Sequence, residues 1–208
     1  MLNKVIDDDS RESRDAFDRG MEILSNKLFL YHHIGQAPLA EIVEFSEYCV
    51  RRHGCQHVVI DSVAKTDLDI EDNKQANQFA ETITRSMNET GAHYHLVAHS
   101  RKGDSGDIRR IPGQDDIKGS VQFSITAFNV VTVWKNELKI DLIKSGQTET
   151  KEGKPLISEW GDGKIRICKQ RVGGQTGEYK TFYNANNYRF RRDYDKYDYP
   201  YMNSHNPF

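Results

Sequence analysis

The sequence predicts an α/β fold with a mostly parallel sheet flanked by helices and an antiparallel meander at its C-terminal edge. Apolar strand patterns alternate with amphipathic helix patterns through the first half of the chain. Short strand patterns then follow one another at close spacing in the second half. A chain of 208 residues is long enough for one such domain with a substantial core.

The first half of the chain predicts helices and strands in alternation. Pro38 is suited to open a helix and Gly54 to end it, and the residues between them are apolar at helical spacing. The strand at 57–61 is nearly all apolar, as a strand covered on both faces should be. In chain order, the expected elements are a helix at 15–25, a strand (KLFLYHH) at 27–33, a helix at 39–52, a strand at 57–61, a helix at 73–90 and a strand at 93–98.

The second half predicts loops and a meander. Residues 100–118 are polar and contain glycines, so they predict a mobile loop, followed by a short helix-like stretch from Ser120. AFNVVTVWKN predicts a strand, 138–163 a long polar connection, and KIRICKQ, EYKTFYN and NYRFRRD the meander. The expected organisation is a polar N-terminal segment with a short helix at 1–26, a folded portion at 27–192 and a disordered, tyrosine-rich acidic tail at 193–208.

Charge and cysteine content exclude several classes of protein. The formal net charge of -2 excludes a globally basic nucleic-acid coat, so nucleic-acid binding requires local clusters of Lys and Arg. Three cysteines without CxxC spacing indicate neither a disulfide framework nor a zinc ribbon, and they favour a reducing, cytoplasmic setting. The polar N-terminus predicts neither a signal peptide nor a membrane anchor, so no membrane partner is expected.

Asp61 ends the apolar run HVVID and is the first candidate functional residue. In open α/β sheets, ligands bind outside the carboxyl ends of the strands, so this carboxylate is expected at the ligand crevice. There it is suited to hold Mg²⁺ beside nucleotide phosphates. The alternative is an ordinary capping aspartate, with Ser62 as the start of a loop.

His99 ends the next strand pattern, LVAH, and is expected in the same crevice. A neutral imidazole there can hydrogen-bond a γ-phosphate, although a capping role is the alternative. His93 and His95 share its face on a two-residue period. With Asp61 they leave open a zinc site in a metal-dependent hydrolase, but a single strand rarely surrounds a tetrahedral ion.

Two groups of basic residues follow. Lys169 and Arg171 alternate onto one face at the end of KIRIC, and two such cations need an anion between them. A nucleotide phosphate of a neighbouring subunit is one candidate anion, and salt bridges to acidic neighbours are the alternative. The polar loop after His99 is suited to grip a single-stranded DNA backbone, or is an ordinary solvated loop. Its basic residues are Arg101, Lys102, Arg109, Arg110 and Lys118.

The segments IDS, LVAHSRKG, DDIKGS with AFNVVTVWKN, and CKQRVGGQTGE together resemble the C-terminal RecA-like domain of DnaB-like hexameric helicases. They are most similar to the primase–helicase branch that includes phage enzymes and the mitochondrial replicative helicase. The resemblance covers roughly Lys27 to Phe190. It implies ATP-dependent 5′–3′ unwinding of DNA by a ring oligomer during replication, in a bacterial cell or a phage-infected host.

The resemblance also implies a role for each candidate residue. Asp61 matches the Walker B aspartate, beside Ser62 at the nucleotide, and His99 matches the γ-phosphate sensor. Lys169 and Arg171 match a sensor lysine and an arginine finger, and the basic loop matches the DNA loop of the central channel. Three residues depart from the family pattern in the segment after the loop, namely Val121, Thr126 and Phe128.

The sequence contains no GxxxxGK[ST] phosphate-binding loop and no strand with the catalytic glutamate. Without them nothing cradles the β- and γ-phosphates or activates water, so we expect no helicase-rate ATP hydrolysis by this chain alone. ATP and Mg²⁺ would be shared with a separately encoded P-loop or primase part, which would pair with an exposed central sheet edge. The alternative is a non-catalytic protein that binds single-stranded DNA or regulates a helicase ring.

Overall fold

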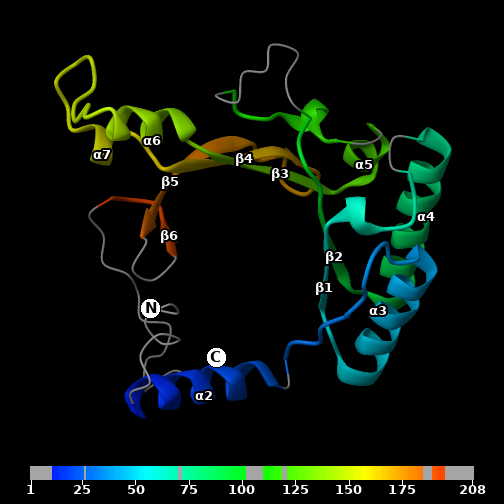
Figure 1. The fold of residues 1–208 in the computed structure, drawn as a ribbon. Coiled ribbons are helices and arrows are strands. Elements are labelled where there is room, and N and C mark those ends of the chain that lie inside the picture. Colours follow the sequence, from blue (N-terminus) through cyan, green and yellow to red (C-terminus); the bar gives the residue numbers. More distant parts are fainter. Residues whose placement is uncertain are drawn as a thin grey trace.

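The computed structural model describes residues 11–25, 27–69, 72–101, 110–118, 121–184 and 189–194, and it contains two sheets. The first is a parallel pair, β1–β2, and the second is antiparallel in the order β3–β4–β5–β6. Figure 1 shows the two sheets meeting at a corner. The elements are α2 (Arg11–Ser25), α3 (Leu39–His53), β1 (His57–Asp61), η1 (Val63–Lys65), α4 (Asn73–Thr90), β2 (His93–Val97), η2 (Gln114–Asp116), α5 (Val121–Thr126), β3 (Asn129–Lys135), α6 (Glu137–Lys144), α7 (Leu156–Glu159), β4 (Gly163–Gln170), β5 (Gly177–Asn184) and β6 (Arg189–Arg191).

The helices α3 and α4 form where the sequence predicts them. Capping residues mark where each helix begins or ends. Gly54 ends α3 with a φ of 70°, a left-handed conformation that favours glycine. Asp72 caps α4, since its carboxylate accepts the N–H groups of Lys74 and Gln75. The expected apolar faces pack on β1 and β2 in one core cluster. Its buried members are Leu39, Val43, Ile60, Val63, Phe79, Ile83, Ala92 and Tyr94.

Only one face of the parallel pair is covered by helices. Ile60 and Tyr94 are buried against α3 and α4, whereas Val59 on the opposite face is 64% exposed. The expectation that the strand at 57–61 is covered on both faces is therefore wrong. The apolar composition of β1 is real, but in the described part of the chain no helix lies on the second face.

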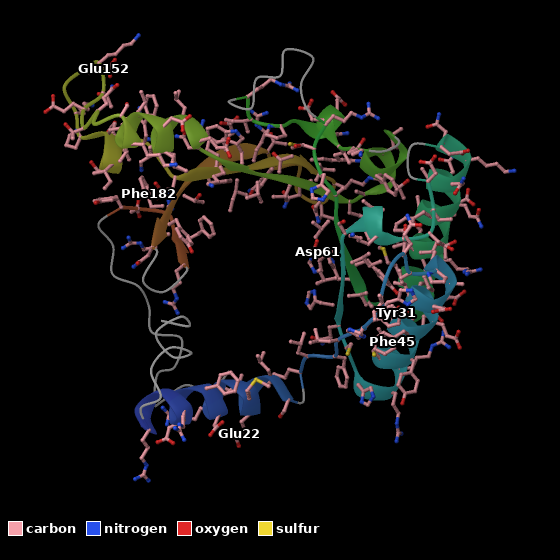
Figure 2. All side chains as sticks on the ribbon, viewed as in Figure 1. Glu22, Tyr31, Phe45, Asp61, Glu152 and Phe182 are labelled. Carbon is pink, nitrogen blue, oxygen red and sulfur yellow. The ribbon has the colours of Figure 1, made fainter. Side chains whose placement is uncertain are left out.

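The expected strand at 27–33 is also wrong. Residues 28–33 lie outside every helix and strand, because no described segment provides a hydrogen-bonded neighbour for them. Aromatic contacts hold this segment against α3 instead. Tyr31 and Phe45 lie beside each other (Figure 2) with their ring centroids 5.1 Å apart, and Phe29 stacks on His53 at 4.3 Å.

The antiparallel meander is confirmed, with Arg166 of β4 paired to Thr132 of β3 and to Glu178 of β5. The long polar connection at 138–163 is wrong in part, because it contains α6 and α7. Contacts of Lys139 hold this polar stretch in place. Its ammonium group is buried and donates to the Asp162 carboxylate at 2.7 Å and to the Ile157 carbonyl at 2.9 Å.

The ends of the chain agree with the sequence only in part. The first helix, α2, begins at Arg11 rather than at residue 15. Most of the expected tail at 193–208 lies outside the described residues, but Tyr194 is described and its ring lies 5.8 Å from that of Phe182. No helix in the described residues is both long and apolar enough to span a bilayer.

Candidate nucleotide and DNA site

Asp61 lies at the carboxyl end of β1, directly beside the end of β2. The parallel register pairs Asp61 with Val97, and the chain reaches His99 two residues after Val97. Asp61 is exposed on the face that no described helix covers, as Figure 2 shows. The two neighbouring strands therefore deliver a carboxylate and an imidazole to one edge of the sheet.

Ser62 turns the chain away from this edge. It is buried, and its carbonyl accepts the N–H group of Lys65 in the turn η1. The peptide bond between Asp61 and Ser62 is cis. Because Ser62 is buried and Asp61 is exposed, only Asp61 presents an open side chain here.

Three histidines cluster on the uncovered face of the parallel pair. Nδ1 of His57 lies 3.0 Å from Nε2 of His95, and the rings of His93 and His95 are 4.5 Å apart. Burial lowers the pKa of His95, and the neighbouring His93 and His57 lower it further. The sequence alternation grouped His93 and His95 but missed His57, which only the strand register reveals. Among the described residues, no group of three or more His, Cys, Asp or Glu is arranged to hold a metal ion.

The basic loop begins and ends at the tip of β2. The N–H of Arg101 donates to the Asp116 carbonyl at 2.6 Å, and the N–H of Lys118 donates to the His99 carbonyl at 2.7 Å. Residues 110–118 are therefore not a plain mobile loop, since they contain η2 and return to form an antiparallel bridge between Ile117 and Ser100, just beyond β2. Arg101 and Lys118 are both exposed at this base, and Lys102 and Arg109 lie outside the described residues.

Arg110 is engaged inside the loop. It forms an ion pair with Asp116. The pKa of Asp116 is lowered, first by the N–H of Gly113 and then by Arg110. Asp116 therefore competes with a DNA phosphate for the guanidinium of Arg110.

Lys169 and Arg171 lie together, as the alternation predicts, but their partners are carbonyl groups at the end of α5. Lys169 Nζ donates to Ser124 O at 2.7 Å and to Ile125 O at 2.9 Å, and Arg171 donates to Ile125 O at 2.6 Å. The last carbonyls of a helix lack helical partners and attract cations, which replaces the expected acidic neighbours. Burial lowers the pKa of Lys169, and the charge of Arg171 lowers it further. The guanidinium also lies 5.1 Å from the ring of Phe128, a contact that sequence reasoning missed.

Comparison with known proteins gives matches among solved structures alone. No family model matches the sequence, and no curated protein does. A DnaB-like replicative helicase, described with its interactions with primase, superposes with a TM-score of 0.64 at 15% identity, over 88% of this chain and 41% of that one. A second solved structure, an ATPase domain, superposes with a TM-score of 0.66 at 15% identity, over 91% of this chain and 63% of that one. The chain has the fold of a DnaB-like helicase ATPase domain.

The match confirms the RecA-like α/β fold class. This chain spans less than two thirds of either matched chain, so both contain an additional part without a counterpart here. Within the helicase ATPase fold, the candidate residues fall into three groups. These are the strand ends with Asp61 and His99, the loop base with Arg101 and Lys118, and the α5 contacts of Lys169 and Arg171.

Proposed function

We propose that this chain is the C-terminal part of a ring-forming replicative DNA helicase, and that a P-loop on another polypeptide completes its nucleotide site. The observation that most directly supports this proposal is the parallel register of β1 and β2. It sets the exposed carboxylate of Asp61 beside the strand that leads through His99 into the basic loop. The proposed cation ligand, phosphate sensor and DNA loop therefore adjoin one another at a single sheet edge.

The donor set at this edge fits a magnesium nucleotide. An exposed carboxylate at a strand end provides the hard oxygen that Mg²⁺ prefers, and the ion when bound neutralises charge on the β- and γ-phosphates. His99 would hydrogen-bond the γ-phosphate. Because the carbonyl of His99 accepts the N–H of Lys118, a shift of His99 would move the base of the DNA loop.

Lys169 and Arg171 would act on the nucleotide of a neighbouring subunit. Both cations are held by neutral carbonyls of α5, which compete with a phosphate more weakly than a carboxylate would. Transfer to a phosphate would exchange neutral hydrogen bonds for charge-assisted ones. The neutral partners of the two cations therefore support an arginine-finger role. A salt bridge to a carboxylate would have favoured a purely structural role.

The test mixes this chain with a P-loop fragment, single-stranded DNA and MgATP, and follows phosphate release. We expect negligible turnover by the chain alone and measurable turnover by the mixture. Arg171→Ala in the mixture should lower turnover by about 10³-fold or more, the usual effect of losing an arginine finger. Arg51→Ala, on the exposed outer surface of α3, is the matched control and should leave turnover unchanged.

Asp61→Asn supplies the second arm of the same experiment. It should abolish turnover in the mixture, because the amide is a much poorer magnesium ligand than the carboxylate. Turnover that survives Asp61→Asn would contradict the nucleotide site. Appreciable turnover by the chain alone, removed by Asp61→Asn, would contradict the need for a second polypeptide.

A second candidate function is a non-catalytic single-stranded-DNA-binding or helicase-regulating protein. The observation that favours it is the loop base, where the exposed Arg101 and Lys118 stand at the two ends of one basic segment. Binding of a fluorescent oligonucleotide to Arg101→Ala and Lys118→Ala, at several salt concentrations, tests this function. Each variant should reduce the salt slope by about 0.7, one phosphate contact on a single strand. Lys65→Ala, on η1, is the control. An unchanged salt slope in both loop variants would contradict this second function.

A further inference from the structure

The two sheets expose apolar side chains on the faces that helices leave bare. We call this set the uncovered surface. On the antiparallel sheet, Val133 pairs with Ile165 and Ile165 with Tyr179, so these side chains share one face. The opposite face is the covered one, since Phe182 packs there beside the buried Lys139 of α6. The exposed members of the uncovered surface are Val59 (64%), Val97 (39%), Val131 (53%), Val133 (74%), Tyr179 (48%) and Phe190 (63%).

Both sheets also end in unpaired strand edges. In the described part of the chain, β2 pairs with β1 alone, and β3 pairs with β4 alone. An open edge beside a bare apolar face is a template for another strand, and stable monomers rarely leave both exposed. The edge and the face therefore point to the same kind of occupant, a segment with an apolar strand of its own.

Contacts through α5 hold the two sheets together at their corner. On one side, Phe123 of α5 meets Phe79 of α4, with ring centroids 5.4 Å apart. On the other side, α5 receives Lys169 from β4, and Thr132 of β3 donates to the Pro112 carbonyl at 2.9 Å. Figure 1 shows α3 and α4 on the outer side of the parallel pair and α6 and α7 on the outer side of the antiparallel sheet, with the uncovered faces turned toward the same region.

We propose that the uncovered surface docks a separate α/β polypeptide of the helicase-ATPase type, which pairs with the open edges of β2 and β3. This inference rests on the proposed function, because that function requires a second polypeptide. The matched ATPase folds supply the argument for the occupant. They superpose on nearly all of this chain and contain further chain that has no counterpart here. One occupant would bury both faces and pair both edges at once.

The test uses glutamate substitutions on each sheet. The probe is a fragment of a DnaB-like helicase ATPase domain that ends where its similarity to this chain begins, and its binding is measured by calorimetry. Val59→Glu and Val133→Glu should each weaken binding about tenfold or more, since a charge would be buried without a partner. Val172→Glu is the matched control, because Val172 is 79% exposed in the turn after β4 and lies outside the uncovered surface. Thermal unfolding checks that all three variants fold.

Hydrogen exchange gives a second readout in the same complex. The amides of β2 and β3 should gain protection on binding, whereas those of α3 should not change. Three results would overturn the docking proposal: no binding, binding that is insensitive to either glutamate, or protection confined to one sheet. Self-association of the chain that Val133→Glu abolishes would assign the surface to a second copy and would also overturn it.

Failure of this inference can be told apart from failure of the proposed function. A complex that shows both glutamate effects but neither hydrolyses ATP nor binds DNA would keep the docking surface and remove the helicase role. A mixture whose ATP hydrolysis depends on Asp61 but ignores Val59→Glu and Val133→Glu would keep the helicase role and remove the docking surface.

Discussion

The parallel pair and the antiparallel sheet of this protein present different chemistry on their bare faces. The bare face of the parallel pair carries the clustered histidines and Asp61, whereas that of the antiparallel sheet is dominated by Val133, Tyr179 and Phe190. The covered faces differ as well. Apolar packing holds the helices against the parallel pair, whereas contacts of the buried Lys139 hold α6 against the antiparallel sheet. The two bare faces therefore differ in composition: Val59 and Val97 of the parallel pair lie among ionisable side chains, whereas the face of the antiparallel sheet is mainly apolar.

The largest expected effect comes from the apolar core of the parallel region. Phe79 is fully buried and contacts α5. Phe79→Ala should lower the free energy of unfolding by about 3–5 kcal/mol, because a large cavity forms. Urea unfolding measures this, with Phe17→Ala on the exposed surface of α2 as the control. A loss below about 1 kcal/mol would mean that the helical layer does not hold the parallel pair.

The antiparallel region should depend on a buried charge instead. Lys139→Met removes the donor for Asp162 and two carbonyls, and should cost about 3 kcal/mol of unfolding free energy. Lys154→Met is the control, because its ion pair with Glu159 spans 3.9 Å between exposed side chains. Equal effects of the two substitutions would show that the Lys139 contacts are ordinary surface contacts.

A smaller effect is expected at the start of α4. Asp72→Ala removes the cap that accepts the N–H groups of Lys74 and Gln75, and should cost about 1 kcal/mol of unfolding free energy. Asp72→Asn, which can still accept both groups, should recover most of the loss. Without that recovery, the contribution of Asp72 would be electrostatic rather than a cap.

The smallest expected effect is a pH dependence confined to the parallel region. The pKa of His95 is lowered in the folded protein, so the unfolded chain takes up the proton first as the pH falls. The free energy of unfolding should have its full value above about pH 6.5 and decline as the pH falls below it. His57, His93 and Asp61 share this face with His95. His95→Gln should flatten the decline between about pH 7 and 5.5, and an unchanged slope would contradict the contribution of His95.

Helix boundaries and faces were predictable from the sequence because their signals are local. Pro38 and Gly54 act within one turn of the chain, and the apolar faces of α3 and α4 follow from helical spacing. The strand at 27–33 failed for the opposite reason. A strand is stable only with a neighbour, and the sequence of the segment itself carries no information about whether that neighbour is present.

The candidate site was predictable residue by residue but not contact by contact. Asp61 could be placed at the end of β1, whereas β2 ends at Val97 and His99, predicted to end that strand, lies two residues beyond it. The addition of His57 to the histidine cluster depends on the register of β1 against β2. The carbonyl partners of Lys169 depend on where α5 ends in space, which no spacing rule specifies.

The contacts of α5 with Lys169 of β4 and with Arg171, which follows β4, make the corner between the sheets depend on what these two cations bind. While Lys169 and Arg171 remain on the carbonyls of Ser124 and Ile125, they help to fix the angle at which the two sheets meet. If both cations moved to a phosphate on an adjacent subunit, that tie would be released. The inter-sheet angle of one protomer would then report the nucleotide state of the next, and a distance label on each sheet would detect it.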